Sequence, residues 1–177
     1  AITLSGCAGS SDPAATGGTE GGKPYIALVS KGFQHQFWQA VKAGAEQAAE
    51  EVDVYVTCEG PDTEADVDQQ IQMLQTALDK SPAAIGIAAL DSQAANPLLQ
   101  QAKDGGIPVI AFDSGVDSDI PLTTASTDNL AAAAEAAKHM VEAIGGEGKV
   151  AVVAHDQTSV TGQERRDGFV KYIEENA

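Results

Sequence analysis

Short apolar runs of strand length alternate with longer stretches that carry apolar residues at helical spacing, beginning at residue 25. The runs at 25–29, 54–56, 84–89 and 107–111 predict strands. Between them, apolar positions three or four residues apart predict a helix after each of the first three strands. Strands that alternate with helices pair in parallel through right-handed crossovers. The pattern therefore predicts an α/β fold with a doubly wound parallel sheet.

The first expected helix contains two adjacent aromatic residues, Phe37 and Trp38. Neighbouring residues on a helix lie on different faces, so one stripe cannot bury both. We expect Phe37 to pack in the core and Trp38 to contact a ligand. The apolar stripe of this helix is predicted to consist of Phe37, Val41, Ala45, Ala48 and Val52.

The alternation restarts after residue 127, which predicts a second lobe. After a weaker strand at 121–125, Asp128 is expected to cap a helix that runs to Ile144. An apolar strand at 149–154 and a helix at 163–175 follow. We assign residues 25–127 to a first α/β lobe and 128–177 to the start of a second. That second part lacks most of its sheet, so we expect it to be poorly stable alone.

The composition and charge of the chain exclude some classes of function. The chain has 177 residues, 43% of them hydrophobic, and a net charge of −16 from 10 basic and 26 acidic residues. Such a charge repels phosphate backbones, so a nucleic-acid partner is not expected. Cys58 has no evident disulfide partner and is expected at a half-buried strand end. The histidines and Cys58 show no paired-ligand spacing, so neither a metal nor another cofactor is expected.

Leu4-Ser5-Gly6-Cys7 resembles the lipobox of bacterial lipoproteins, in which the Cys receives a lipid. An ordinary Cys in a disordered tail is the alternative. The resemblance implies that residues 1–7 are the remnant of a lipoprotein signal peptide and that Cys7 is the lipidation site. Residues 8–24 are rich in Gly, Ser, Thr and Ala, which is typical of a flexible linker. We therefore expect a lipid anchor to a bacterial cell membrane.

Polar and aromatic residues follow the predicted strands at the edge where parallel sheets bind ligands. Amide, imidazole, carboxylate and ammonium groups beside aromatic rings suit a small polyhydroxylated molecule, whose C–H faces stack on the rings. Asp113 could instead start a turn, and Asp91, Ser92 and Asp128 are better read as helix N-caps. The acidic run at 62–68 is expected at a helix N-terminus rather than in a calcium loop.

Five segments carry a resemblance when they are taken in order: 25–30, 37–45, 106–113, 127–129 and 164–169. Together they look like the periplasmic sugar-binding proteins of the ribose-binding type. The resemblance covers residues 24–177 and implies two lobes, joined by a hinge, that close on one sugar and deliver it to an ABC importer. Proteins of this family are nearly twice as long, so the chain is expected to be a fragment with a truncated second lobe.

The resemblance also implies ligand-binding residues. Phe37 and Trp38 match the aromatic pair of the family, Asp113 matches the acid after the fourth strand, and Arg165 matches the arginine of the second-lobe helix. His35 stands where ribose binders place an amide. Lys31 and the longer loop look like the branch that binds rhamnose or autoinducer-2, but that branch has an acid where Gly162 stands here.

The combined expectation is a lipid-anchored, extracytoplasmic solute-binding protein that works as a monomer with an ABC transporter permease and is not an enzyme. A receptor for autoinducer-2 or another signal molecule is the alternative within the same fold. A regulator of the lactose-repressor type would need a DNA-binding segment before residue 24, where this chain has a Gly-rich tether. A surface enzyme is a further alternative, but the sequence contains neither a nucleophile elbow nor a nucleotide-binding loop to support it.

Overall fold

The computed structural model of the protein describes residues 18–176. The lipobox resemblance, the proposed lipidation of Cys7 and most of the predicted linker lie outside these residues. Within the described range, none of the helices has the length and apolar character that crossing a membrane requires.

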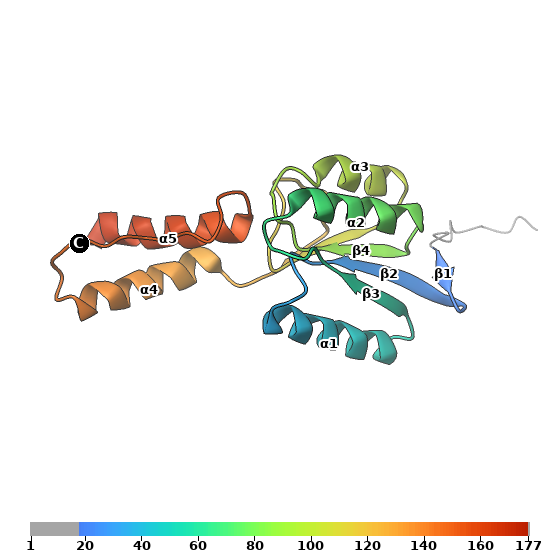
Figure 1. Ribbon diagram of the computed structural model, residues 1–177, viewed down its shortest axis with the longest axis horizontal. Helices are drawn as coiled ribbons and strands as arrows, with labels where there is room; N and C mark the ends of the chain where they lie inside the picture. Colours follow the sequence, from blue (N-terminus) through green and yellow to red (C-terminus); the bar gives the residue numbers. More distant parts are fainter. Residues whose placement is uncertain (1–17, 177) are drawn as a thin grey trace, which may run out of the picture.

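A twisted parallel sheet forms the centre of the chain (Figure 1). Strand β2 pairs with β3 on one side and with β4 on the other, and β5 and β6 follow β4, all in parallel. This strand order is that of a doubly wound fold whose topological switch point lies between β2 and β4. The predicted fold class is confirmed. The bounds of the strands are Lys23–Val29 (β2), Tyr55–Glu59 (β3), Ala84–Ile87 (β4), Val109–Phe112 (β5) and Thr124–Ala125 (β6).

Part of the predicted linker is in fact ordered structure. Strand β1, Thr19–Glu20, pairs antiparallel with the beginning of β2, where Glu20 lies opposite Lys23. Gly21 and Gly22 form the turn with positive φ angles of 61° and 84°, which glycine adopts without a steric penalty. The predicted boundary at residue 24 is therefore too late, because backbone pairing extends the sheet to residue 19.

Helices cover both faces of the sheet (Figure 1). Helices α2, Val67–Asp79, and α3, Asn96–Asp104, lie side by side on one face, and α1, Gln36–Glu51, lies on the other. The main core fills the layer between the sheet and the pair α2 and α3. Its fully buried members include Leu74, Leu99, Ile85, Ile87 and Val109.

The buried stripe of α1 differs from the prediction by one position. Trp38 and Ala49 are its buried residues, whereas Phe37 and Val52 are 54% and 67% exposed. Most candidate positions in this helix are alanines, which fit either face equally well. The packing partner of the large indole ring decided the orientation: Trp38 meets Phe112 of β5 at 6.4 Å between ring centroids.

Residues beyond 127 form a helical hairpin that projects from the sheet (Figure 1). Helices α4, Asn129–Ala143, and α5, Val160–Asn176, pack against each other. The expected strand at 149–154 is wrong, because this segment is irregular and Val153 is 95% exposed. A strand needs a hydrogen-bonding partner, and residues 18–176 place no strand beside it.

Several predicted helix caps are confirmed. Asp128 accepts a hydrogen bond from the Ala131 N–H at the start of α4. Within the acidic run, Asp66 is the N-cap of α2 and accepts from the Gln69 N–H. For α3, however, the predicted N-cap role of Asp91 and Ser92 is wrong, because Ala95 is the N-cap residue of this helix. Asp91 instead accepts from the N–H groups of residues 93 and 94 in the turn before α3. Cys58 is half-buried in β3, and this burial raises the pKa of its thiol.

Candidate ligand-binding site

The switch point between β2 and β4 is fixed by a buried glutamine. Gln70 of α2 is 1% exposed, and its amide donates to the carbonyl oxygens of Ser30 and Ala88, both at 2.9 Å. Its own carbonyl oxygen accepts from the Leu90 N–H at 2.9 Å. One side chain therefore ties together the segments that leave the two central strands. This tie holds Lys31, the next residue after Ser30, at the carboxyl edge of the sheet.

A cavity of about 620 Å³ opens at this edge, between the sheet and the first turns of α1 and α5. All of the predicted ligand-binding residues line it, together with four residues that the sequence analysis did not select. Their contact with a ligand stays a prediction. The predicted residues are Lys31, His35, Phe37, Trp38, Asp113 and Arg165, and the added ones are Gln36, Glu64, His155 and Thr161.

In the aromatic wall of the cavity, the expected burial of Phe37 and Trp38 is reversed. The Trp38 ring is 4% exposed, and its indole Nε1–H donates to Glu64 Oε1 at 2.7 Å. Phe37 lies edge-on to it, with 4.9 Å between ring centroids and 79° between the planes. Trp38 therefore forms the floor of the wall, and the exposed ring of Phe37 is the one available to stack on a ligand.

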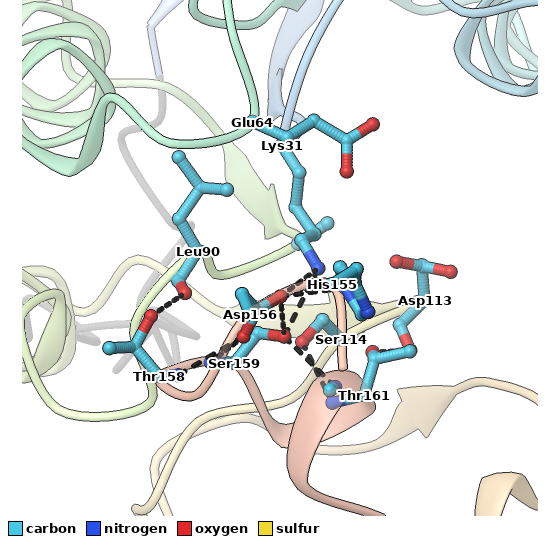
Figure 2. A network of polar contacts seen from close by, with 12 residues as sticks. Lys31, Glu64, Leu90, Asp113, Ser114, His155, Asp156, Thr158, Ser159 and Thr161 are labelled. Atoms are coloured by element: carbon cyan, nitrogen blue, oxygen red, sulfur yellow. Dashed lines mark hydrogen bonds and ion pairs between the residues drawn. The ribbon is translucent and has the colours of Figure 1, made fainter. Parts of the chain in front are cut away.

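Lys31 reaches from the sheet to the start of α5 (Figure 2). It is 2% exposed, and its Nζ donates to Ser159 Oγ at 3.2 Å and lies 3.8 Å from Asp156 Oδ2. A buried ammonium group requires such a partner, because removal from water strongly disfavours its charge. The ammonium group thus joins two parts of the chain that are far apart in sequence.

Asp156 is the centre of this network (Figure 2). Its carboxylate accepts from the Ser159 N–H at 2.8 Å, from Ser159 Oγ at 2.8 Å and from the Thr158 N–H at 3.0 Å. His155 Nε2 lies 2.6 Å from Oδ2. Although burial opposes ionisation, these hydrogen bonds and the neighbouring cations hold the pKa of Asp156 below its ordinary value.

Gly162 leaves room for the Asp156 carboxylate. A Cβ atom at position 162 would lie 2.7 Å from Asp156 Oδ1, closer than such atoms approach. The side chain that the rhamnose and autoinducer-2 branch carries at this position therefore has no space here. The carboxylate of Asp156 occupies that space instead.

Asp113 follows β5 in an unusual backbone conformation. Its φ angle is 57°, in the left-handed region that costs a residue with a Cβ some free energy. The Asp113 N–H donates to the Ala125 carbonyl at 2.9 Å, and its own carbonyl oxygen accepts from Thr161 Oγ1 of α5 at 3.3 Å. Burial raises the pKa of its carboxyl group, while the charges of Lys31 and Arg165 oppose this rise.

Arg165 lines the cavity from α5, and Asn129 orients it. Its Nε donates to Asn129 Oδ1 at 2.8 Å. Arg166 instead donates to the exposed carboxylate of Asp167 at 2.6 Å. The positive charge of Arg165 acts on Asp113 and offsets part of the rise that burial causes in the pKa of that carboxyl group.

His35 stands at the outer rim. It precedes α1 as the N-cap residue without a side-chain capping hydrogen bond, and its ring is 75% exposed. Its Nε2 lies 4.0 Å from Glu64 Oε1. Glu64 and Thr161 gave no sequence signal of their own, since each lies in a polar segment whose position depends on folding. No group of three or more His, Cys, Asp or Glu side chains in residues 18–176 is arranged to hold a metal ion.

A doubly wound sheet with a polar and aromatic cavity at its carboxyl edge, closed partly by a helix from a later segment, defines a small-molecule binding protein of the two-lobed type. Residues 26–177 match the family model described as "Periplasmic binding protein domain". The chain therefore belongs to this family of binding proteins, and the resemblance found in the sequence is confirmed.

Characterised relatives carry sugar-binding names. The chain is similar to the D-allose-binding periplasmic protein of Escherichia coli K12, with 27% identity over 150 residues, which cover 80% of this chain and 48% of that protein. The chain spans about half the length of the curated relatives it matches.

Two solved structures agree with the fold. A solute-binding protein of an ABC transporter from Agrobacterium vitis, with bound D-fucose, superimposes with a TM-score of 0.83 at 32% identity and covers 86% of this chain and 54% of its own. A protein from Brachyspira murdochii, named an ABC transporter, LacI family transcriptional regulator, is 41% identical with a TM-score of 0.76 and covers 88% of this chain and 52% of its own.

Proposed function

We propose that the protein is an extracytoplasmic solute-binding component that holds one small neutral sugar in the 620 Å³ cavity and delivers it to an ABC importer. The observation that carries this proposal is the composition of the wall. An exposed aromatic ring stands beside carboxylate, guanidinium and ammonium groups, all within one cavity. The sugar-binding names of the relatives support the same ligand class.

Each residue of the cavity wall has its own proposed role in ligand binding. Phe37 offers its exposed ring to the C–H face of a sugar, and Trp38 fixes the position of Phe37 from below. Asp113 accepts hydrogen bonds from hydroxyl groups, and Arg165 donates to ring or hydroxyl oxygens. Hydrogen bonds to charged groups are stronger and more directional than those between neutral groups, so these two residues set the orientation of the ligand.

We propose that binding involves a conformational change in which two parts of the chain meet around the ligand. The sheet contributes Lys31 and Asp113, and the segment around the start of α5 contributes His155, Thr161 and Arg165. A ligand that touches both sides favours the arrangement in which they meet. Closure around the sugar is therefore coupled to binding.

A lipid on Cys7 and a monomeric state complete the proposal. The lipobox resemblance supports an anchor at the outer side of a cell membrane, with the following Gly-rich and Ser-rich residues as a spacer. Metabolic labelling with a fatty-acid analogue, compared between the wild type and Cys7→Ser, tests this part. Label that persists in the variant would refute it.

A thermal-shift screen of the full-length protein tests the ligand class. The panel contains D-ribose, D-allose, D-fucose, D-arabinose and autoinducer-2, with an amino acid and a nucleobase as unrelated compounds. A cognate sugar raises the melting temperature by mass action. A shift with only the unrelated compounds would refute the sugar, and a shift with only autoinducer-2 would favour the signal receptor.

Phe37→Ala tests the stacking role once a ligand is known. We expect an affinity loss of about tenfold, since an aromatic contact is worth about 1 kcal/mol beyond burial. Phe33→Ala is the matched control, because Phe33 lies in the loop just before α1 but outside the residues that line the cavity. Equal affinities for the two variants would contradict the assignment.

A further inference from the structure

Glu64 lines the cavity although it comes from the acidic loop before α2, a segment with an evident capping role. Its side chain is 31% exposed, which is less than that of the neighbouring His35. Its Cγ packs against Gly32, where a Cβ atom would lie only 3.0 Å away. The close approach of the backbone at Gly32 therefore gives Glu64 its place in the wall.

The two carboxylate oxygens of Glu64 have different environments. Oε1 accepts the indole N–H of the buried Trp38 at 2.7 Å. Among the residues that the structure describes, no group donates a hydrogen bond to Oε2. The carboxylates of Glu64 and Asp113 line the same cavity, and Figure 2 shows both beside the Lys31 and Asp156 network. One oxygen is thus committed to the protein, and the other remains available to a ligand.

Positive and negative side chains around the cavity do not balance once the existing ion pair of Lys31 is taken into account. Asp156 neutralises Lys31 at 3.8 Å, so Arg165 is left with two carboxylates, those of Glu64 and Asp113. Glu64 and Asp113 are close enough to influence each other, since the charge of Glu64 raises the pKa of Asp113. With His35 and His155 uncharged, the accessible wall is therefore rich in acceptors and carries an excess of negative charge.

We propose that Glu64 is a specificity-determining residue, whose free Oε2 accepts a hydrogen bond from a ligand hydroxyl or amine and whose charge excludes anionic sugars such as uronates and sugar phosphates. This inference rests on the proposed sugar-binding function. A ligand carboxylate or phosphate near Oε2 and Asp113 would meet two like charges in a site partly shielded from water. A neutral sugar brings no negative charge to these two carboxylates, and its hydroxyls donate hydrogen bonds to them.

Glu64→Gln separates this role from a purely structural one. Glutamine retains a carbonyl oxygen that can accept the Trp38 N–H, but it lacks the charge. If Glu64 only positions Trp38, the variant keeps the preference of the wild type for neutral sugars. If Glu64 excludes anions, the preference weakens while the tryptophan environment stays the same.

Isothermal titration of the full-length protein measures this preference. Each neutral sugar that binds is paired with its own anionic form: D-fucose with D-galacturonate, D-allose with D-allose 6-phosphate, and D-ribose with D-ribose 5-phosphate. We expect the ratio of neutral to anionic affinity to fall about tenfold or more in Glu64→Gln. The emission maximum of Trp38, the single tryptophan of the chain, should not move. Glu46→Gln is the control, since Glu46 is an exposed residue of α1 paired with Lys42.

A measurement on the wild type alone covers the case in which Glu64→Gln does not fold. Raising the salt concentration screens charge repulsion, so the anionic sugar should gain affinity while the neutral sugar does not. An unchanged ratio in the variant, or in the wild type at high salt if the variant fails, overturns the role of Glu64 alone. A wild type that binds no neutral sugar overturns the proposed function as well.

Discussion

Replacement of Asp156 by Ala tests how strongly the α5 segment is held to the sheet. The variant removes the carboxylate that accepts three hydrogen bonds from residues 158 and 159 and lies 3.8 Å from Lys31 Nζ. Lys31 is 2% exposed, so the change leaves a buried ammonium group without its ion-pair partner. Removal of one partner from a buried ion pair costs about 3–5 kcal/mol.

The segment can relieve this penalty by moving away and letting water reach Lys31. We therefore expect Asp156→Ala to lower the free energy of unfolding by about 3 kcal/mol and to shift the ligand-free protein toward more open arrangements. Urea denaturation measures the first effect, and small-angle X-ray scattering of the full-length protein measures the second, as a larger radius of gyration.

A double-mutant cycle with Lys31→Met isolates the ion pair. In the Lys31→Met background the buried ammonium group is absent, so Asp156→Ala should cost less there than in the wild type, with a coupling energy above about 1 kcal/mol. Additive effects of the two substitutions, within about 0.5 kcal/mol, would show that Lys31 does not depend on Asp156. An unchanged radius of gyration would separately refute the opening.

Three further predictions concern stability and pH. Asp113→Asn should raise the melting temperature of the ligand-free protein and weaken sugar binding, because burial raises the pKa of this carboxyl group and ionised Asp113 therefore opposes folding above that pKa. Gln70→Leu should lower the free energy of unfolding by about 3 kcal/mol or more in chemical denaturation, since three buried backbone groups lose their hydrogen-bond partner. A loss below about 1 kcal/mol would contradict the proposed role of Gln70 in holding the two strand ends together. Asp156 has a lowered pKa when folded, so its stabilisation is present above the unfolded value and is lost as the pH falls through the folded one. An acid titration should show a smaller loss in Asp156→Ala than in the wild type.

Most of the first α/β unit could be predicted because its signals are local. The strands at β2, β4 and β5 and the helices α2 and α3 follow from short apolar runs and helical spacing, and Gly106 ends α3 with a φ of 72°. Two predictions were wrong because they depended on long-range packing. Segment 149–154 has the composition of a strand but not a partner, and the face of α1 depended on where Trp38 could pack.

The candidate site divides in the same way. Sequence reasoning found residues that follow strands, because the carboxyl edge of a parallel sheet brings strand ends together whatever the side chains are. It could not find Glu64, whose place in the wall depends on Trp38 and on the close approach of the backbone at Gly32.

By itself, the sequence determined the α/β alternation, the acidic charge that disfavours nucleic-acid binding, and the polar residues at the strand ends that line the cavity. Only the tertiary structure decided which aromatic ring is exposed, that Lys31 is buried against Asp156, and that Glu64 joins the site. The physical reason is the separation along the sequence over which each kind of interaction acts. Hydrophobic periodicity and capping act between residues a few positions apart, whereas burial and charge pairing join residues as distant as 31 and 156 and exist only once the chain has folded.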